Sequence, residues 1–91
     1  MSHTTREKAK LLNRVRRIRG QVEAVERALE DEKGCTDVLQ LIAGVRGAIN
    51  GLMAEVVEDH VRMHVADRGL AQEERDEGAA ELIDIVRAYL K

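Results

Sequence analysis

Apolar positions recur along the chain at helical spacing and predict three helices. Over residues 5–33 they follow one another at steps of four and three, the spacing of a helical stripe with heptad character: Leu11, Val15, Ile18, Val22, Val25 and Leu29. Thr4 and Glu7 have the spacing of a capping box before this stripe, and Gly34 is expected to end the helix.

A second and broader apolar stripe predicts a helix over residues 37–66, with Thr36 or Asp37 as its cap. Its main members recur at steps of four and three: Val38, Ile42, Val45, Ile49, Leu52 and Val56. Further apolar residues flank the stripe, so we expect this helix to be buried on several sides. Three glycines (Gly44, Gly47 and Gly51) weaken a helix, and close backbone approach is expected to compensate.

The third predicted helix spans residues 72–90, after a break at Asp67–Gly69. Its first turns are acidic, which suits a helix N-terminus. The chain has no proline, no internal repeat and no linker long enough to divide it. The prediction is therefore an all-α chain with a single domain over residues 1–91.

The composition limits how this domain is stabilised. Of 91 residues, 44% are hydrophobic, but Tyr89 is the only aromatic. So short a chain without large rings builds a thin core, and we expect a second chain to complete it. No apolar run approaches the roughly 18 residues of a membrane span, and no signal peptide is visible. The single cysteine, Cys35, excludes an internal disulfide and fits a reducing cytoplasm.

Positive charge is concentrated at one end of the chain. Residues 1–20 carry seven basic residues and one acid, whereas the whole chain has a formal net charge of −2. At about 100° per residue, two basic flanks border the apolar stripe and should face solvent. One holds Arg6, Lys10, Arg14 and Arg17, and the other holds Lys8, Arg16 and Arg19; Arg46 on the second helix can extend the patch. Such a row suits repeated phosphates, although a solvated charged face has the same pattern.

One cysteine and two histidines are candidate metal ligands. His60 and His64 share a helix face, so they can hold one metal ion. Cys35 precedes His60 by 25 residues, or about 37 Å of straight helix. Either the chain bends sharply or the cysteine comes from another subunit. An antiparallel pair of second helices, with a two-fold axis near Ile49, would create two equivalent sites. However, a histidine pair at this spacing can arise by chance, and a lone cysteine is often only a small buried residue. Neither feature alone requires a metal.

Three stretches resemble the CsoR/RcnR/FrmR family of small all-helical bacterial repressors, which includes copper, nickel/cobalt and formaldehyde sensors. They are RVRRIRGQVEAVERALE (14–30), CTDVLQLIAGVRGAINGLMAEVVEDH (35–60) and VRAYLK (86–91). The resemblance covers essentially the whole chain. It implies a three-helix protomer, a dimer of antiparallel second helices and a flat, disc-like homotetramer. It also implies basic residues of helices one and two that bind operator DNA and release it when effector binds.

The resemblance also bears on the effector. Cys35, His60 and His64 match ligand positions of the family. The start MSHT is similar to the nickel/cobalt sensors, in which the N-terminal amine, here of Ser2 after removal of Met1, and the third residue, here His3, join the site. Formaldehyde sensors typically begin Met-Pro and commonly carry an acid where this chain has His64. Met63 and Lys33 depart from the full nickel/cobalt ligand set, and a copper sensor would want a second cysteine.

These observations favour a non-enzymatic, cytoplasmic repressor that binds operator DNA without metal. Its DNA-binding residues would be Lys10, Arg14, Arg16, Arg17, Arg19 and Arg46. Nickel or cobalt is the favoured effector and zinc the four-coordinate alternative. The runner-up is a formaldehyde-responsive repressor that uses Cys35 and an amine, and a different class is a helical adaptor for an acidic protein. An enzyme would need an orienting group and an oxyanion site beside Cys35, and neither is recognisable.

Overall fold

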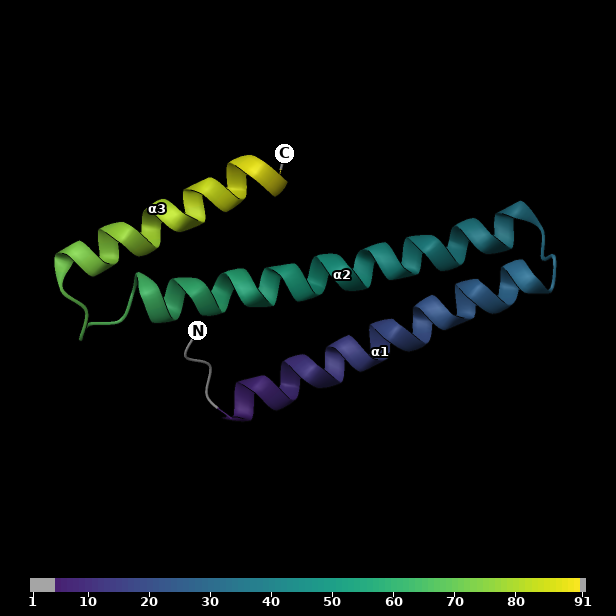
Figure 1. The fold of residues 1–91 in the computed structure, drawn as a ribbon, viewed down its shortest axis with the longest axis horizontal. Helices are drawn as coiled ribbons and strands as arrows, with labels where there is room; N and C mark the ends of the chain where they lie inside the picture. Colours follow the sequence, from purple (N-terminus) through teal and green to yellow (C-terminus); the bar gives the residue numbers. More distant parts are fainter. Residues whose placement is uncertain (1–4, 91) are drawn as a thin grey trace. The chain divides into compact units, whose positions relative to one another are not determined.

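The structure, a computed structural model, describes residues 5–90, and all the regular structure in this range is helical. The helices are α1 (Thr5–Glu30), α2 (Cys35–His64) and α3 (Gln72–Tyr89), joined by two short loops (Figure 1). The prediction of an all-α chain with three helices is therefore confirmed. Against the expected 5–33, 37–66 and 72–90, the starts of α1 and α3 agree and the other four helix ends differ by one to three residues.

The end of α1 is set by Glu32 and not by the expected Gly34. The N–H of Lys33 donates to the Ala28 carbonyl at 2.9 Å, and the N–H of Glu32 donates to the Leu29 carbonyl at 3.1 Å. These two bonds define a Schellman motif with Glu32 in the left-handed position, at φ 54°. No described glycine has a positive φ. The sequence-based expectation that Gly34 ends the helix is thus wrong.

The first turn of α2 begins earlier than predicted. The carbonyl of Gly34 accepts a 3.2 Å hydrogen bond from the Val38 N–H, so Gly34 precedes the helix and Cys35 is its first residue. Thr36 and Asp37, expected to cap the helix, lie inside its first turn. The cysteine therefore stands on the helix itself and not in the loop before it.

Side chains order the loop between α2 and α3. Asp67 accepts a 2.8 Å bond at Oδ1 from the Gly69 N–H, which closes an Asx turn. The Arg75 guanidinium donates to the carbonyls of Asp67 and Arg68 at 3.2 and 3.3 Å. Glu74 accepts a 3.0 Å bond from the Ala71 N–H, one half of a capping box. The loop is therefore held to the first turns of α3.

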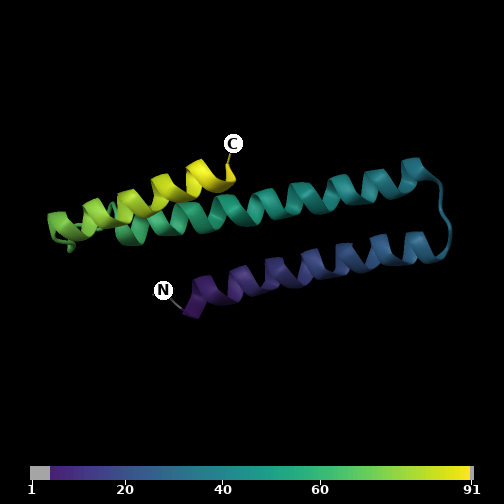
Figure 2. The same ribbon diagram turned by 45° about the horizontal axis from the view of Figure 1, so that its top comes forward.

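The chain divides into two compact units, with the boundary between Met53 and Ala54. In the first unit, α1 and the first part of α2 run antiparallel (Figures 1 and 2). The apolar stripe of α1 splits here into two rows of residues seven apart. Leu11, Ile18 and Val25 are partly buried, whereas Val15, Val22 and Leu29 are 44%, 49% and 61% exposed. One row therefore packs within the chain and the other is left for a different partner.

In the second unit, the end of α2 and α3 run antiparallel (Figures 1 and 2). Gly78 is buried at this contact. A Cβ atom there would overlap the His64 carbonyl oxygen and lie 2.9 Å from the carbonyl carbon and Cβ of His64. Only glycine lets the two helix backbones come this close.

Very little apolar surface is buried by the chain's own contacts. Among the described residues, Ala28, 6% exposed, is the only buried hydrophobic side chain, and no residue of α2 is buried. The expectation that α2 is buried on several sides is not met by one chain. Large hydrophobic side chains remain exposed on all three helices and at Leu90, directly after α3: Leu12, Val15, Val22, Leu29, Leu39, Leu41, Ile42, Ile49, Ile83, Ile85, Val86, Tyr89 and Leu90. None of the helices in residues 5–90 has the length and hydropathy that a transmembrane helix requires.

Candidate metal centre and nucleic-acid interface

The two helical histidines form a pair near the end of α2. His60 and His64 are four residues apart, and their ring centroids lie 4.9 Å from each other at an interplanar angle of 42°. Both side chains are partly buried. The predicted pair therefore shares one face of the helix, as two ligands of a single ion must.

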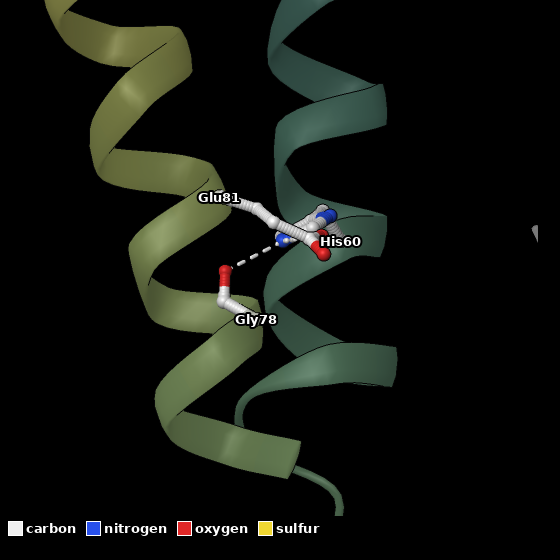
Figure 3. Close-up of polar contacts among 3 residues, drawn as sticks. All are labelled: His60, Gly78 and Glu81. Carbon is white, nitrogen blue, oxygen red and sulfur yellow. Dashed lines mark hydrogen bonds and ion pairs between the residues drawn. The ribbon is translucent and has the colours of Figure 1, made fainter. Parts of the chain in front are cut away.

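A backbone carbonyl of α3 selects the tautomer of the neutral His60 ring. Nε2 of His60 lies 2.9 Å from the Gly78 carbonyl oxygen (Figure 3). Because a carbonyl oxygen can only accept, Nε2 carries the proton and donates it. In the neutral ring Nδ1 then holds a lone pair, which is the form that binds a metal ion. The hydrogen bond to α3 thus prepares His60 as an Nδ1 ligand.

A carboxylate stands beside the same ring nitrogen. Oε2 of Glu81 lies 3.9 Å from His60 Nε2 (Figure 3), and the Glu81 side chain is 58% exposed. At this distance and exposure the pair contributes little to stability. The Glu81 carboxylate is thus a second acceptor near the ring. After a small rotation of either side chain, His60 Nε2 could donate to this carboxylate in place of the Gly78 carbonyl.

The surroundings of the histidine pair are acidic. A depression of about 240 Å³ lies between the end of α2 and the first half of α3, lined by His64, Leu70, Glu74, Glu77, Gly78 and Glu81. On the outer face of α2, Arg62 pairs with Glu58. Glu74, Glu77 and Glu81 therefore place three carboxylates in the same depression as the His64 side chain. This environment suits ligands that must receive a divalent cation.

Sequence reasoning missed the two α3 groups that support His60. Gly78 lies within the predicted third helix, where a glycine among helix formers signals close backbone contact. That signal was present in the sequence EGAAE, but it does not identify the partner element. Glu81 has no distinguishing pattern, because acids are common throughout α3.

Cys35 is the remaining described candidate ligand, and one chain does not bring it to the histidines. It is a free, exposed thiol at the first residue of α2. α2 continues without interruption to His64, and the 25 steps from Cys35 to His60 span about 37 Å at 1.5 Å each. Within residues 5–90, no three His, Cys, Asp or Glu side chains are close enough to hold a metal ion. The predicted ligands Ser2 and His3 lie outside the described residues.

The chemistry of the donors fits a transition metal. Imidazole nitrogen and thiolate sulfur suit zinc, nickel and cobalt better than magnesium or calcium, which prefer oxygen. Two imidazoles on one face supply two positions, so at least one further donor is needed. The exposed thiol of another chain can supply it.

The candidate phosphate contacts belong to the first unit. Arg16, Arg17 and Arg19 of α1 and Arg46 of α2 are exposed, as is Lys10. The Arg16 guanidinium donates to the Asn13 side-chain oxygen at 3.3 Å. Arg14, which we expected to face solvent, is partly buried. The candidate cationic face, which these six residues define, is therefore exposed except at Arg14.

A helical chain that joins a paired-histidine face to a cationic first helix has the features of a DNA-binding sensor. Comparison with known proteins identifies the class more closely. Residues 7–88 match the family model described as metal-sensitive transcriptional repressor. The chain belongs to this family, and it is a transcriptional repressor and not an enzyme.

Relatives and solved structures extend over nearly the whole chain. An uncharacterized protein of the bioA 5′ region of Serratia marcescens is 54% identical, and the transcriptional repressor RcnR of Salmonella arizonae is 41% identical; both matches cover all of both chains. A variant of the formaldehyde-responsive regulator FrmR from Salmonella enterica serovar Typhimurium is 49% identical over 97% of this chain and 99% of that one, with a TM-score of 0.88. The copper-sensing repressor CsoR of Geobacillus thermodenitrificans, solved with Cu(I), is 26% identical over 100% of this chain and 94% of that one, with a TM-score of 0.89.

Proposed function

We propose that this chain, as a single domain over residues 1–91, is an operator-binding repressor that releases DNA when it binds a transition metal ion. Nickel or cobalt is the favoured effector, and zinc is the four-coordinate alternative. The observation that carries the proposal is the His60–His64 pair, with His60 held by the Gly78 carbonyl so that its Nδ1 can ligate. DNA is bound by Lys10, Arg14, Arg16, Arg17, Arg19 and Arg46.

The metal site is completed across a subunit boundary. Cys35 of one protomer joins His60 and His64 of the partner subunit, since the described part of one chain offers only two of these ligands together. Antiparallel pairing of two α2 helices about an axis near Ile49 would bring the start of one beside the end of the other. Ile49 is 46% exposed and available for such a contact.

Exposed hydrophobic rows support a larger assembly. Val15, Val22 and Leu29 form a continuous exposed row on α1, and α3 exposes a second apolar group that includes Ile83 and Tyr89. Pairing of α2 helices alone leaves these surfaces in water, at a cost of about 25 cal/mol per Å². A homotetramer built from two such dimers would cover them.

The N-terminal residues connect the site to DNA. His3 and the Ser2 amine are added ligands in the proposal, and they directly precede α1, which carries the cationic face. Their capture would pull on the DNA-binding helix. A coupling of about 1–3 kcal/mol per effector is typical, and DNA must weaken metal binding by the same factor.

The choice of metal over aldehyde rests on His64. RcnR is 41% identical to the chain. The solved FrmR structure is a variant in which histidine replaces a glutamate whose number is that of His64 here, whereas this chain carries the histidine naturally. A second imidazole adds a metal ligand, whereas the sulfur–methylene–nitrogen bridge considered below uses only a thiol and an amine.

Cobalt titration tests the proposed site. Adding Co(II) to the metal-free protein should produce the charge-transfer absorption of a Co–thiolate bond, and Cys35→Ala should abolish it. In a gel-shift assay, the protein should bind the DNA upstream of its own gene, and this binding should weaken as cobalt is added. A titration without the absorption band, or a Cys35→Ala variant indistinguishable from wild type, would remove the metal site. An adaptor for acidic proteins would give no shift with this DNA.

Formaldehyde is the second candidate effector, favoured by the exposed free thiol and the 49% identity to FrmR. The Cys35 thiolate would attack the aldehyde carbon, and an amine of Ser2 or Lys10 would displace the oxygen as water. The product is a sulfur–methylene–nitrogen bridge whose mass exceeds the starting protein by one carbon atom. Intact mass after mild exposure tests it, because the crosslink must be absent in Cys35→Ala.

A further inference from the structure

The guanidinium of Arg14 lies against the bare backbone of Gly51. Nη1 of Arg14 is 2.8 Å, and Cζ 3.8 Å, from the point where a Cβ atom of residue 51 would stand. Both residues belong to the first compact unit, Arg14 on α1 and Gly51 on α2. The space that a side chain at position 51 would fill is occupied by the cation.

The helical position of Arg14 explains this placement. At about 100° per residue, Arg14 lies within about 20° of Val25, at the edge of the row that packs within the chain. Arg14 is partly buried, while Arg16 and Arg17 on the same helix are exposed. Among the candidate DNA contacts on α1, Arg14 is the one whose guanidinium lies at a glycine of α2.

The contact is specific to one of the three glycines in α2. A Cβ atom at Gly44 or Gly47 would have nothing within 4 Å, whereas one at Gly51 would meet the Arg14 guanidinium. The close approach expected at these glycines is therefore found only at Gly51, and it is made by a side chain and not by backbone.

We propose that Gly51 is a positioning residue for DNA binding, because the lack of a side chain there holds open a fixed place for the Arg14 guanidinium against α2. We call this place the Arg14 seat. The inference rests on the proposed function, in which Arg14 contacts DNA. A guanidinium already held in place loses less conformational freedom when it grips a phosphate. The seat also ties the cationic face of α1 to α2, the helix that carries Cys35 and the histidines.

Gly51→Ala tests the seat with little risk to the fold. The added Cβ meets the far end of a flexible side chain, which can swing aside without moving the backbone. Fluorescence anisotropy with a labelled duplex of the DNA upstream of its own gene should show binding about three- to tenfold weaker, the equivalent of ordering one long side chain. In an Arg14→Ala background the same substitution should cause no further loss.

Gly47→Ala is the matched control, since it makes the same chemical change where there is open space. It should leave DNA affinity within about twofold of wild type, with an unchanged oligomeric state by analytical ultracentrifugation. An equal loss of affinity in the Gly51→Ala and Gly47→Ala variants would overturn the positioning role. So would a Gly51→Ala loss that persists undiminished in the Arg14→Ala background.

An NMR measurement separates the seat from DNA binding itself. The Arg14 Nε–Hε signal should be distinct from those of the exposed arginines in the wild type, and should move to join them in Gly51→Ala but not in Gly47→Ala. A signal unmoved by Gly51→Ala, in a protein that still binds the duplex, refutes the seat alone. If the wild-type protein binds no DNA although the Arg14 signal moves in Gly51→Ala, the proposed function is refuted, and the positioning role with it.

Discussion

Substitution of Gly78 by alanine should separate α3 from the end of α2. The new Cβ would overlap the His64 carbonyl oxygen and approach two further His64 atoms at 2.9 Å. These are backbone and near-backbone atoms of a helix, so they cannot rotate away as a flexible side chain can. The substitution should also displace the Gly78 carbonyl from His60 Nε2, now 2.9 Å away.

The size of the effect follows from three contributions. Overpacking against backbone costs about 2 kcal/mol, and a lost hydrogen bond costs about 1 kcal/mol. The higher helix propensity of alanine returns about 1 kcal/mol. The net loss of about 2 kcal/mol corresponds to a fall in melting temperature of roughly 8–16 °C for a chain of this size.

Thermal denaturation of the intact oligomer, followed by circular dichroism at one protein concentration, measures the loss. Gly20→Ala is the control, because it makes the same change on α1 at an exposed position with nothing within 4 Å, and it should stabilise the protein. The reasoning is refuted if Gly78→Ala melts at or above the wild-type temperature. It is also refuted if both variants shift the temperature alike.

Three further predictions concern the turns and the cationic face. Glu32→Gly should stabilise the protein by about 1 kcal/mol, because glycine adopts the left-handed φ of 54° without strain; chemical denaturation measures the gain, and a loss would contradict the Schellman assignment. Arg75→Ala should destabilise it by about 1–2 kcal/mol, because the guanidinium's hydrogen bonds to the Asp67 and Arg68 carbonyls are lost, whereas Arg68→Ala, an exposed control, should change stability by less than about 0.5 kcal/mol. Arg17→Gln should weaken binding to all duplex sequences alike and reduce the slope of log affinity against log salt by about 0.9, and an unchanged slope would exclude Arg17 as a phosphate contact.

The helices could be predicted from the sequence because apolar spacing decides them. The row of α1 residues at steps of four and three required a helix, and the structure has it from Thr5 to Glu30. The sequence did not predict which of the two rows of this stripe packs within the chain. Ile18 and Val22 are both apolar, and only the placement of α2 distinguishes them. Helix ends were predicted less well, because a strained Glu32 replaced the glycine that usually occupies its position.

From the sequence, only the part of the candidate site that lies on a single helix was predictable. Spacing alone indicated that His60 and His64 share a face, and the 4.9 Å between their rings agrees. The support from Gly78 and the nearby Glu81 comes from α3, and contacts between elements leave no periodic signal in a sequence. The seat of Arg14 on Gly51 is of the same kind.

Subunit complementation most directly tests the claim that the metal site is shared between chains. Cys35→Ala and His60→Ala proteins should each fail to form the Co–thiolate absorption. When they are unfolded and refolded together at equal concentration, half of the dimers contain both variants, and each such dimer holds one intact site. The mixture should then regain about a quarter of the wild-type absorption. A mixture that stays colourless, although native mass spectrometry shows the mixed dimers, would contradict the shared site.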